Sequence, residues 1–353
     1  MRKYRVGIIG CGRMGWLFNE DRLADQPVSH AEAYLLNKKT EFSAVCDLDR
    51  EKLKGISKKY DIKNIYTDYR KMLKKVDLDI VSIATPTTLH KEVCGAASAA
   101  GVRAIFCEKP IAASLEEADE MIRVCKRNKT VLMVNHTRRW DRSFNDVKGM
   151  LDKGDIGKVD LIIAFAAAGL MNSGTHLFDI LRYYFGDVLS VSGALIPDGS
   201  TDPGGRGTVR FKNDILTFFY SGFREYVLFG ANIYGQKGMI DLGGQIRRDD
   251  AYRLLKAQAS RKESGIKELR RANLKSSRWT PPMLNAVRNI VNVLDNKEPP
   301  LCTGEDGMAT VEVAMAFHES DREKTKKITL PLKDRSLRLI PRETSFTKNG
   351  RLE

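Results

Sequence analysis

The chain has 353 residues, of which 42% are hydrophobic and 29% are charged, and its formal net charge is +14. This composition excludes a disordered or collagen-like chain. No apolar run approaches the roughly 18 residues that a membrane-spanning helix needs. The length predicts about two domains with well-buried cores.

The N-terminus and the cysteines indicate a compartment. The chain passes from Met1 directly into an expected strand at Tyr4, with no apolar segment of a signal peptide between them. Six cysteines are present without a C-x-x-C pair, and five of them fall in expected strands, helices or a glycine turn, as reduced core thiols do. We therefore expect a cytoplasmic protein that does not bind a membrane.

Half of the net positive charge comes from one stretch, from Arg247 to Arg278. Eleven Lys/Arg face four Asp/Glu there, a surplus of seven out of fourteen. One interpretation is a solvated helix and loop. The other is a patch that steers an anionic substrate, such as a phosphorylated or nucleotide-linked sugar. The stretch has few aromatic residues to stack on bases, so nucleic acid is not an expected partner.

The first expected element is a buried strand at residues 4–9, which runs directly into a glycine-rich turn at residues 10–15. Residues 14–18 can open a helix behind it. Glycines permit a tight turn and let the backbone approach a pyrophosphate, which lies at the helix N-terminus. A strand, a G-x-G-x-x-G turn and a helix together predict a dinucleotide site, with contacts from Gly10, Gly12, Arg13, Met14 and Gly15.

A second strand is expected at residues 41–46, and it ends in Asp47. The spacing from Gly15 to Asp47 is 32 residues, which exceeds the usual gap of about 20 in this fingerprint. The surplus lies at residues 19–28, a polar stretch that we interpret as a surface loop inserted before a helix beginning near Ser29.

The acidic residue after the second strand indicates the cofactor. A carboxylate at Asp47 suits the ribose 2′-hydroxyl of NAD and repels the 2′-phosphate of NADP. Asp49 and Arg50 are alternative ribose contacts, and Arg50 leaves some room for NADP. We expect NAD to be preferred.

Strands and helices alternate as far as residue 135, at residues 65–66, 69–73, 79–84, 92–100, 102–107, 115–128 and 130–134. Alternation with short connections predicts an α/β fold, a doubly wound parallel sheet of the Rossmann type with right-handed crossovers. Ligands bind such sheets at the carboxyl ends of the strands. The segments at those ends supply the remaining expected cofactor contacts, which are Thr85, Pro86, His90, Glu108, Lys109 and Asn135.

The pattern changes after an expected helix at residues 143–153. Strands are expected at residues 158–165, 188–196, 208–211, 215–221, 226–234 and 239–242, and their short links indicate antiparallel hairpins. Two late helices, at residues 282–296 and 305–319, precede a last strand at 327–330. We therefore predict a Rossmann domain at residues 1–135, a second α+β domain with a mainly antiparallel open sheet at 136–332, and a polar tail at 333–353. The late helices are candidates to pack back on the first domain.

The second domain also carries candidate chemistry. A helix at residues 172–185 places Asn172, His176, Asp179 and Tyr183 on one stripe. A histidine with a carboxylate one turn away can act as a general base whose ring that acid orients. Taken alone, His176 also fits a structural histidine. No Cys/His cluster has zinc spacing, so a catalytic metal is not expected.

Together these motifs resemble the Gfo/Idh/MocA oxidoreductases, named for glucose–fructose oxidoreductase and inositol dehydrogenase. The resemblance spans residues 4 to about 330. The matching stretches are Gly10–Gly15, Ala84–Thr87 with His90, Glu108–Pro110, Arg138–Trp140, Gly174–His176 with Asp179, and Thr303–Gly307.

The resemblance implies hydride exchange between NAD(P) and a ring hydroxyl of a sugar or cyclitol. It assigns the catalytic lysine to Lys109 and the base to His176, with Asp179 beside it. Many members of the family carry an aspartate one turn before the histidine, where this chain has Asn172. Asparagine cannot accept a proton, so a relay has to run through His176, Lys109 or a water molecule.

Two other functions stay open on the same scaffold. One is an NAD-dependent glycoside hydrolase, which oxidises its substrate transiently and expels a leaving group. The other is a non-catalytic sensor that only binds its ligand.

The resemblance also implies a homodimer or homotetramer, in which another subunit covers the outer face of the second domain's sheet. We expect that face to include Phe218, Tyr220, Phe229 and Ile233.

Overall fold

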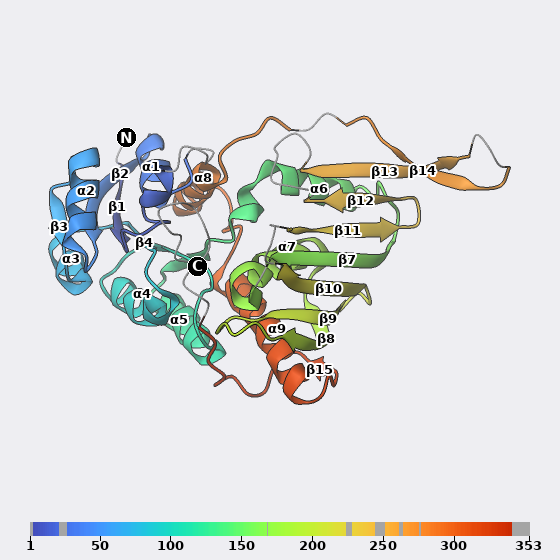
Figure 1. Ribbon diagram of the computed structural model, residues 1–353. Coiled ribbons are helices and arrows are strands. Elements are labelled where there is room, and N and C mark those ends of the chain that lie inside the picture. The colour runs from blue at the N-terminus through green and yellow to red at the C-terminus, as the bar shows by residue number, and fades with distance from the viewer. Residues whose placement is uncertain are drawn as a thin grey trace. The chain divides into compact units, whose positions relative to one another are not determined.

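The computed structural model describes residues 3–20, 27–167, 169–223, 228–243, 251–260, 264–274 and 277–340. The chain forms two compact units (Figure 1). The first unit comprises Met1–Arg142 and Trp279–Ala309, and the second comprises Ser143–Arg278 and Thr310–Glu353. The domain limits expected from the sequence, at residues 135 and 332, remain predictions.

Within its described residues, the first unit contains a six-stranded sheet in the order β3-β2-β1-β4-β5-β6 (Figure 1). All of its recorded strand pairs are parallel, which confirms the expected doubly wound α/β fold. The inner strands are short, mostly apolar runs that are largely buried, whereas the edge strand β3 is mostly exposed. The strands are β1 (Tyr4–Ile9), β2 (Thr40–Cys46), β3 (Asn64–Tyr66), β4 (Ile80–Ile83), β5 (Ala104–Cys107) and β6 (Val131–Val134).

Capping residues begin several helices of the first unit. Asp49 accepts hydrogen bonds from the backbone N–H groups of Glu51 and Lys52 at the start of α2, and Ser114 accepts one from Glu117 at the start of α5. The helices are α1 (His30–Leu36), α2 (Arg50–Tyr60), α3 (Tyr69–Lys75), α4 (His90–Ala99), α5 (Leu115–Arg127) and α8 (Pro282–Leu294).

The late helix α8 belongs to the first unit, although it follows the second unit's sheet in the chain. Asp295, directly after α8, accepts hydrogen bonds from the Tyr4 hydroxyl at 2.6 Å and from the Lys39 ammonium at 2.5 Å. Earlier in the helix, Asn289 Oδ1 accepts one from the indole N–H of Trp140 at 3.2 Å. These contacts fix the returning chain against the Rossmann sheet.

The second unit's described residues form a nine-stranded mixed sheet in the order β14-β13-β12-β11-β7-β10-β9-β8-β15 (Figure 1). Its neighbouring strands are antiparallel, except that β7 and β10 run parallel. The strands are β7 (Val159–Ala167), β8 (Val188–Ile196), β9 (Gly204–Phe211), β10 (Leu216–Phe223), β11 (Gly230–Gly235), β12 (Gly238–Leu242), β13 (Tyr252–Ala259), β14 (Lys267–Arg271) and β15 (Ile328–Thr329).

Helices cover one face of this sheet. They are α6 (Arg142–Asp152), α7 (Thr175–Phe185) and α9 (Gly304–Arg322), whose residues from Thr310 onward lie in the second unit. Phe178 of α7 and Phe317 of α9 both pack against Phe219 of β10, with ring centroids 4.9 and 5.2 Å away. This aromatic cluster forms the centre of the unit's core.

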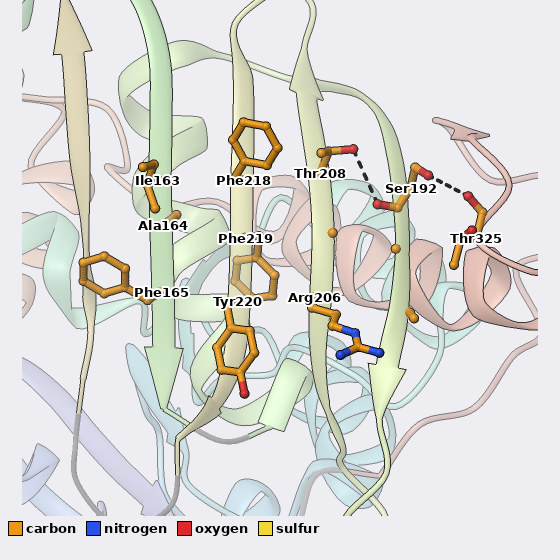
Figure 2. A pocket seen from close by; sticks show the side chains of 13 residues that line it. Ile163, Ala164, Phe165, Ser192, Arg206, Thr208, Phe218, Phe219, Tyr220 and Thr325 are labelled. Atoms are coloured by element: carbon orange, nitrogen blue, oxygen red, sulfur yellow. Dashed lines mark hydrogen bonds between the residues drawn. The ribbon is translucent and has the colours of Figure 1, made fainter.

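The opposite face of the sheet is open to solvent. Ile163, Phe218 and Tyr220 are 39%, 49% and 40% exposed. They lie beside a shallow hollow of about 590 Å³ on this face (Figure 2). The expectation that Ile233 lies here is wrong, because it pairs with Ile162 and Ile240, and all three side chains are fully buried on the helix side.

Two other expectations are corrected. The glycine turn does not open an α-helix at residues 14–18, since only a 3-10 helix, Leu17–Glu20, follows it, and α1 begins at His30. Where the structure describes it, the basic stretch after Arg247 forms the β13–β14 hairpin and not a helix, and the strands of this hairpin extend beyond the other strands (Figure 1). Parts of the expected insertion, strand, basic stretch and tail lie outside the described residues, at 21–26, 226–227, 247–250, 261–263, 275–276 and 341–353.

Candidate functional site

The three glycines of the turn after β1 have different surroundings. Gly10 has a φ of +98°, and a Cβ there would lie 2.3 Å from the carbonyl oxygen of Ala84. A Cβ at Gly15 would lie 2.3 Å from the carbonyl oxygen of Gly10. Apart from its chain neighbours, no atom of the described residues lies within 4 Å of the Cβ position at Gly12. Gly10 and Gly15 are therefore required by the protein's own packing, whereas Gly12 leaves room for a ligand to approach the backbone.

Asp47 joins the ends of β1 and β2. Its Oδ2 accepts a hydrogen bond from the backbone N–H of Cys11 at 2.6 Å, and its Oδ1 accepts one from the N–H of Asp49 at 2.8 Å. The carboxylate is thus held at the glycine turn, half-buried. Asp49 caps α2, and Arg50, the first residue of that helix, is exposed.

The chain after β4 carries a polar group suited to a ligand. Thr85 Oγ1 is buried and has no hydrogen-bond partner among the described residues, while the neighbouring Pro86 is exposed. An unsatisfied buried hydroxyl in a native structure calls for a partner from outside the chain.

His90, the first residue of α4, binds two loops together. Its Nε2 lies 3.0 Å from the carbonyl oxygen of Thr85, and its Nδ1 lies 3.0 and 3.1 Å from those of Pro110 and Ile111. The ring is buried, and burial lowers the pKa of His90, although these carbonyl contacts oppose the shift. His90 thus supports the loops that hold Thr85 and Lys109.

Glu108 and Asn135, at the ends of β5 and β6, contact each other. Asn135 Nδ2 donates to Glu108 Oε1 at 2.6 Å, and both side chains are buried. Their roles as cofactor contacts remain predictions. Glu108 also contacts His30 (Nε2 to Oε1, 2.9 Å). His30 stands 15 positions after Gly15 and belongs to no recognised motif. Only its place at the start of the helix behind the turn could have indicated it.

Lys109 follows β5, and its side chain is half-buried. The Lys109–Pro110 peptide bond is cis. The ammonium is close enough to Glu108 to help lower the pKa of that carboxyl. A half-buried lysine at the carboxyl end of a central parallel strand can donate a hydrogen bond to a reacting oxygen.

The second unit supplies the histidine. A π-helical turn, Gly169–Gly174, leads into α7, so Asn172 lies in this turn and His176 is the second residue of the α-helix. Asn172 and His176 are half-buried, and Asp179 is fully buried on the same helix. The expected single helix from residue 172 is therefore divided, with the candidate base immediately after the division.

Asp202 holds the start of the π-helical turn. Its carboxylate accepts hydrogen bonds from the backbone N–H groups of Met171 and Asn172, at 2.8 and 2.9 Å, and is buried. Gly169, with a φ of +86°, makes room for it, because a Cβ there would lie 2.4 Å from Asp202 Oδ2. Asp202 could not be identified from the sequence, because it lies 31 and 30 residues from these two partners in a segment without a recognised motif.

The groups of the first unit fit a nicotinamide dinucleotide. Gly12 offers an open backbone approach, and Arg13 and Met14 stand beside it in the turn. Asp47 offers a fixed carboxylate for a ribose, and Thr85 offers a hydroxyl that has no hydrogen-bond partner within the part of the chain that the structure describes. In the described part of the chain, no group of three or more His, Cys, Asp and Glu side chains is arranged to hold a metal ion. Nor does that part contain a helix long and apolar enough to cross a membrane.

The chain is similar in sequence and in fold to known proteins. A D-apiose dehydrogenase from Paraburkholderia graminis is 30% identical over 211 residues, which are 55% of this chain and 53% of that protein. A myo-inositol 2-dehydrogenase from Thermotoga maritima is 24% identical over 344 residues, which are 91% of this chain and 97% of that protein. A solved structure of levoglucosan dehydrogenase with NADH and levoglucosan has a TM-score of 0.79 and 19% identity, covering 94% of this chain and 100% of that one.

The family models cover most of the sequence. The model of the Gfo/Idh/MocA oxidoreductases with an NAD-binding Rossmann fold matches residues 4–136, and the model of that family's C-terminal alpha/beta domain matches residues 167–330. These matches agree with the two folds described above. The chain belongs to the Gfo/Idh/MocA family of NAD-binding oxidoreductases.

Proposed function

We propose that the protein is an NAD-preferring dehydrogenase that exchanges a hydride with a ring hydroxyl or ketone of a sugar or cyclitol. The proposal rests on the groups that follow three strands of the first unit's sheet. The open approach at Gly12, the carboxylate of Asp47 and the half-buried Lys109 follow β1, β2 and β5 of one parallel sheet. Such a set suits a dinucleotide with its reactive ring near a lysine.

The preference for NAD rests on Asp47. A 2′-phosphate would face this fixed carboxylate, whereas a 2′-hydroxyl can donate a hydrogen bond to it. The glycine turn at Gly10–Gly15 would hold the pyrophosphate.

Bound NAD supplies the hydride acceptor, and the chain's own residues handle the proton and the oxygen. In the oxidative direction, His176 accepts the proton of the substrate hydroxyl. Lys109 donates a hydrogen bond to the same oxygen and stabilises its negative charge as the hydride leaves. Asp179, which is fully buried three positions further along the same helix, is the proposed support for the ring of His176. Asn172 cannot accept a proton, so further transfer runs through His176, Lys109 or water.

The basic residues of the β13–β14 hairpin favour an anionic substrate. A surplus of positive charge around β13 and β14 makes a phosphorylated or nucleotide-linked sugar a candidate, because a basic surface raises the local concentration of anions. Pairing of Lys256 with Asp155 at 2.9 Å and of Arg270 with Glu268 at 3.1 Å offsets part of this charge. A solvated surface hairpin remains the alternative.

We propose a cytoplasmic homodimer or homotetramer. All six cysteines lie in the described part of the chain, where they are buried and free of disulfides, as suits a reducing compartment. The exposed Ile163, Phe218 and Tyr220 support an assembly in which a second subunit covers the open face of the sheet (Figure 2).

Asn172, in place of the aspartate that many relatives carry, keeps two other functions in view. A glycoside hydrolase on this scaffold would cleave its substrate without net production of NADH. A non-catalytic sensor would bind NAD and a sugar and turn over neither. Net NADH formation from a free sugar or cyclitol separates the proposed dehydrogenase from both.

The test is a screen of the purified protein with NAD against cyclitols, sugar phosphates and nucleotide sugars, followed by Lys109→Ala and His176→Ala. Each replacement should lower turnover by about a hundredfold or more, the usual effect of losing an acid–base or oxyanion group. NADH affinity should change far less. As the matched control, Asn172→Asp should leave turnover within about tenfold. Turnover that survives both alanine replacements would refute the assigned roles.

A further inference from the structure

A buried chain of hydrogen bonds connects α1 to the residue before Lys109. His30 is the first residue of α1 and is fully buried. Its Nε2 lies 2.9 Å from Glu108 Oε1, and its Nδ1 lies 3.0 Å from Ser82 Oγ. The hydroxyls of Ser82 and Tyr34 are in turn 2.8 Å apart. Both nitrogens of the His30 ring therefore have partners from the centre of the sheet.

The same residue also contacts the glycine turn through its main chain. The backbone N–H of His30 donates to the carbonyl oxygen of Met14 at 3.0 Å, and that of Ala31 donates to Gly15 at 3.0 Å. One residue thus contacts the expected cofactor turn with its backbone and Glu108 with its side chain. All of these contacts lie within the first unit.

Glu108 is held on more than one side. Its Oε1 also accepts a hydrogen bond from Asn135 Nδ2 at 2.6 Å, and only 8% of the residue is exposed. Burial raises the pKa of Glu108, but the hydrogen bond from His30, assisted by Asn135 and the charge of Lys109, holds the pKa below its ordinary value. A charged, buried side chain with fixed donors also fixes its own main chain.

We infer that His30 is a positioning residue for Lys109: it holds the Glu108 carboxylate, and with it the adjoining main chain of Lys109, in a fixed relation to the glycine turn. This inference rests on the proposed function, in which Lys109 acts on the reacting oxygen. A displacement of about 1 Å in such a group can cost about a hundredfold in rate. Cofactor affinity is a separate property, because the backbone bonds from residues 30 and 31 survive replacement of the imidazole.

The replacement that isolates the imidazole is His30→Leu, with His30→Gln as its conservative partner. Leucine fills similar space without a donor, whereas the glutamine amide can still donate to Glu108. Ser98→Ala is the control for a lost buried hydrogen bond in the same unit, since the Ser98 hydroxyl bonds to Thr130 and Asn128, at 3.1 and 3.0 Å. All three replacements should lower the melting temperature to some degree.

The readout that does not need a substrate is the chemical reactivity of Lys109. Acetylation by acetic anhydride, resolved by peptide mass spectrometry, should become at least about threefold faster at Lys109 in His30→Leu, relative to the exposed Lys126. His30→Gln and Ser98→Ala should leave the ratio near the wild-type value. Should His30→Leu fail to fold, Glu108→Gln, which preserves side-chain volume, takes its place in the same measurement.

A double-mutant cycle tests the route. If His30 acts through Glu108, then His30→Leu combined with Glu108→Gln changes Lys109 reactivity no more than the stronger single replacement. Independent effects that multiply would overturn the inference, and so would an unchanged Lys109 reactivity in His30→Leu.

Turnover completes the experiment. With a substrate from the screen, His30→Leu should lower kcat by about thirtyfold or more while the Kd for NADH stays within about threefold. A loss of NADH affinity as large as the loss in kcat would overturn the inference. If the wild-type protein turns over no substrate, the proposed function fails, and the acetylation cycle still decides the role of His30.

Discussion

Replacing Asp47 with asparagine should remove most of the preference for NAD over NADP. The replacement removes the charge and keeps an oxygen that can accept the Cys11 N–H bond, which measures 2.6 Å in the structure, but its amide NH2 group cannot accept the second bond, from the Asp49 N–H at 2.8 Å. The glycine turn should therefore keep its shape. A change in cofactor preference can then be assigned to the carboxylate charge.

The expected size follows from the placement of the carboxylate. Two unit charges about 5 Å apart repel by about 3 kcal/mol at an effective dielectric constant of about 20. Asp47 is half-buried, so solvent and salt screen part of this. A remainder of about 1.4 to 3 kcal/mol corresponds to roughly tenfold to a hundredfold in affinity.

Titration calorimetry with NAD and NADP measures the preference directly. The wild-type protein should bind NAD at least about tenfold more tightly, and Asp47→Asn should bring the two affinities within about threefold of each other. Asp49→Asn is the matched control, because Asp49 caps α2 with its side chain. Tighter binding of NADP by the wild type, or loss of the preference in the Asp49 variant alone, would show that the reasoning is wrong.

Three further predictions concern the turn, the assembly and acid stability. Gly12→Ala should weaken NADH binding at least about tenfold at an unchanged melting temperature, whereas Gly15→Ala should lower the melting temperature, because only the methyl group at Gly15 would meet the protein, 2.3 Å from a carbonyl oxygen. Calorimetry that showed weaker binding only for Gly15→Ala and a lower melting temperature only for Gly12→Ala would contradict these separate roles. Phe218→Glu should shift light scattering from an oligomer to a monomer of 39.7 kDa, since it places a charge on the open apolar face; a monomeric wild type would rule out the assembly. The free energy of unfolding should fall as the pH drops below 6.5, because burial, with the charges of Arg139 and Lys109, holds the pKa of His136 well below 6.5 in the folded protein, whereas the unfolded chain takes up the proton. The free energy should change by up to about 1.4 kcal/mol per pH unit, and urea titrations at several pH values should show a smaller change for His136→Gln.

The parallel sheet was predictable because its strands are short apolar runs between helices of ordinary length. Strands β1, β2 and β4 to β6 coincide closely with the expected segments, and Asp47 meets the glycine turn as strand order requires. The fold class needs only this alternation. The base role of His176 was predicted from its spacing to Asp179 and the role of Lys109 from its place at a strand end, and the family resemblance assigned the same two residues.

Other features could not be predicted from local pattern. The β13–β14 hairpin has many basic residues on both faces at the edge of a sheet, which conceals the alternation of a half-buried strand. Ile233 was assigned to the wrong face, because a strand's parity fixes two faces but not which of them the helices cover. His30 and Glu108 are 78 residues apart, and only the folded sheet brings their side chains together.

The ring of His90 also limits how the protein can change in evolution. The carbonyl oxygens of Thr85, Pro110 and Ile111 all lie within 3.1 Å of its two nitrogens. A neutral ring carries one N–H, which donates to the carbonyls of one loop, while the other loop packs against the opposite edge of the same ring. An insertion or deletion that moved the accepting carbonyls away would leave a buried donor unsatisfied, at a cost of about 1 to 3 kcal/mol. The lengths of these two loops are therefore coupled, so new substrate specificities should arise through changes elsewhere, in loops that no shared side chain holds.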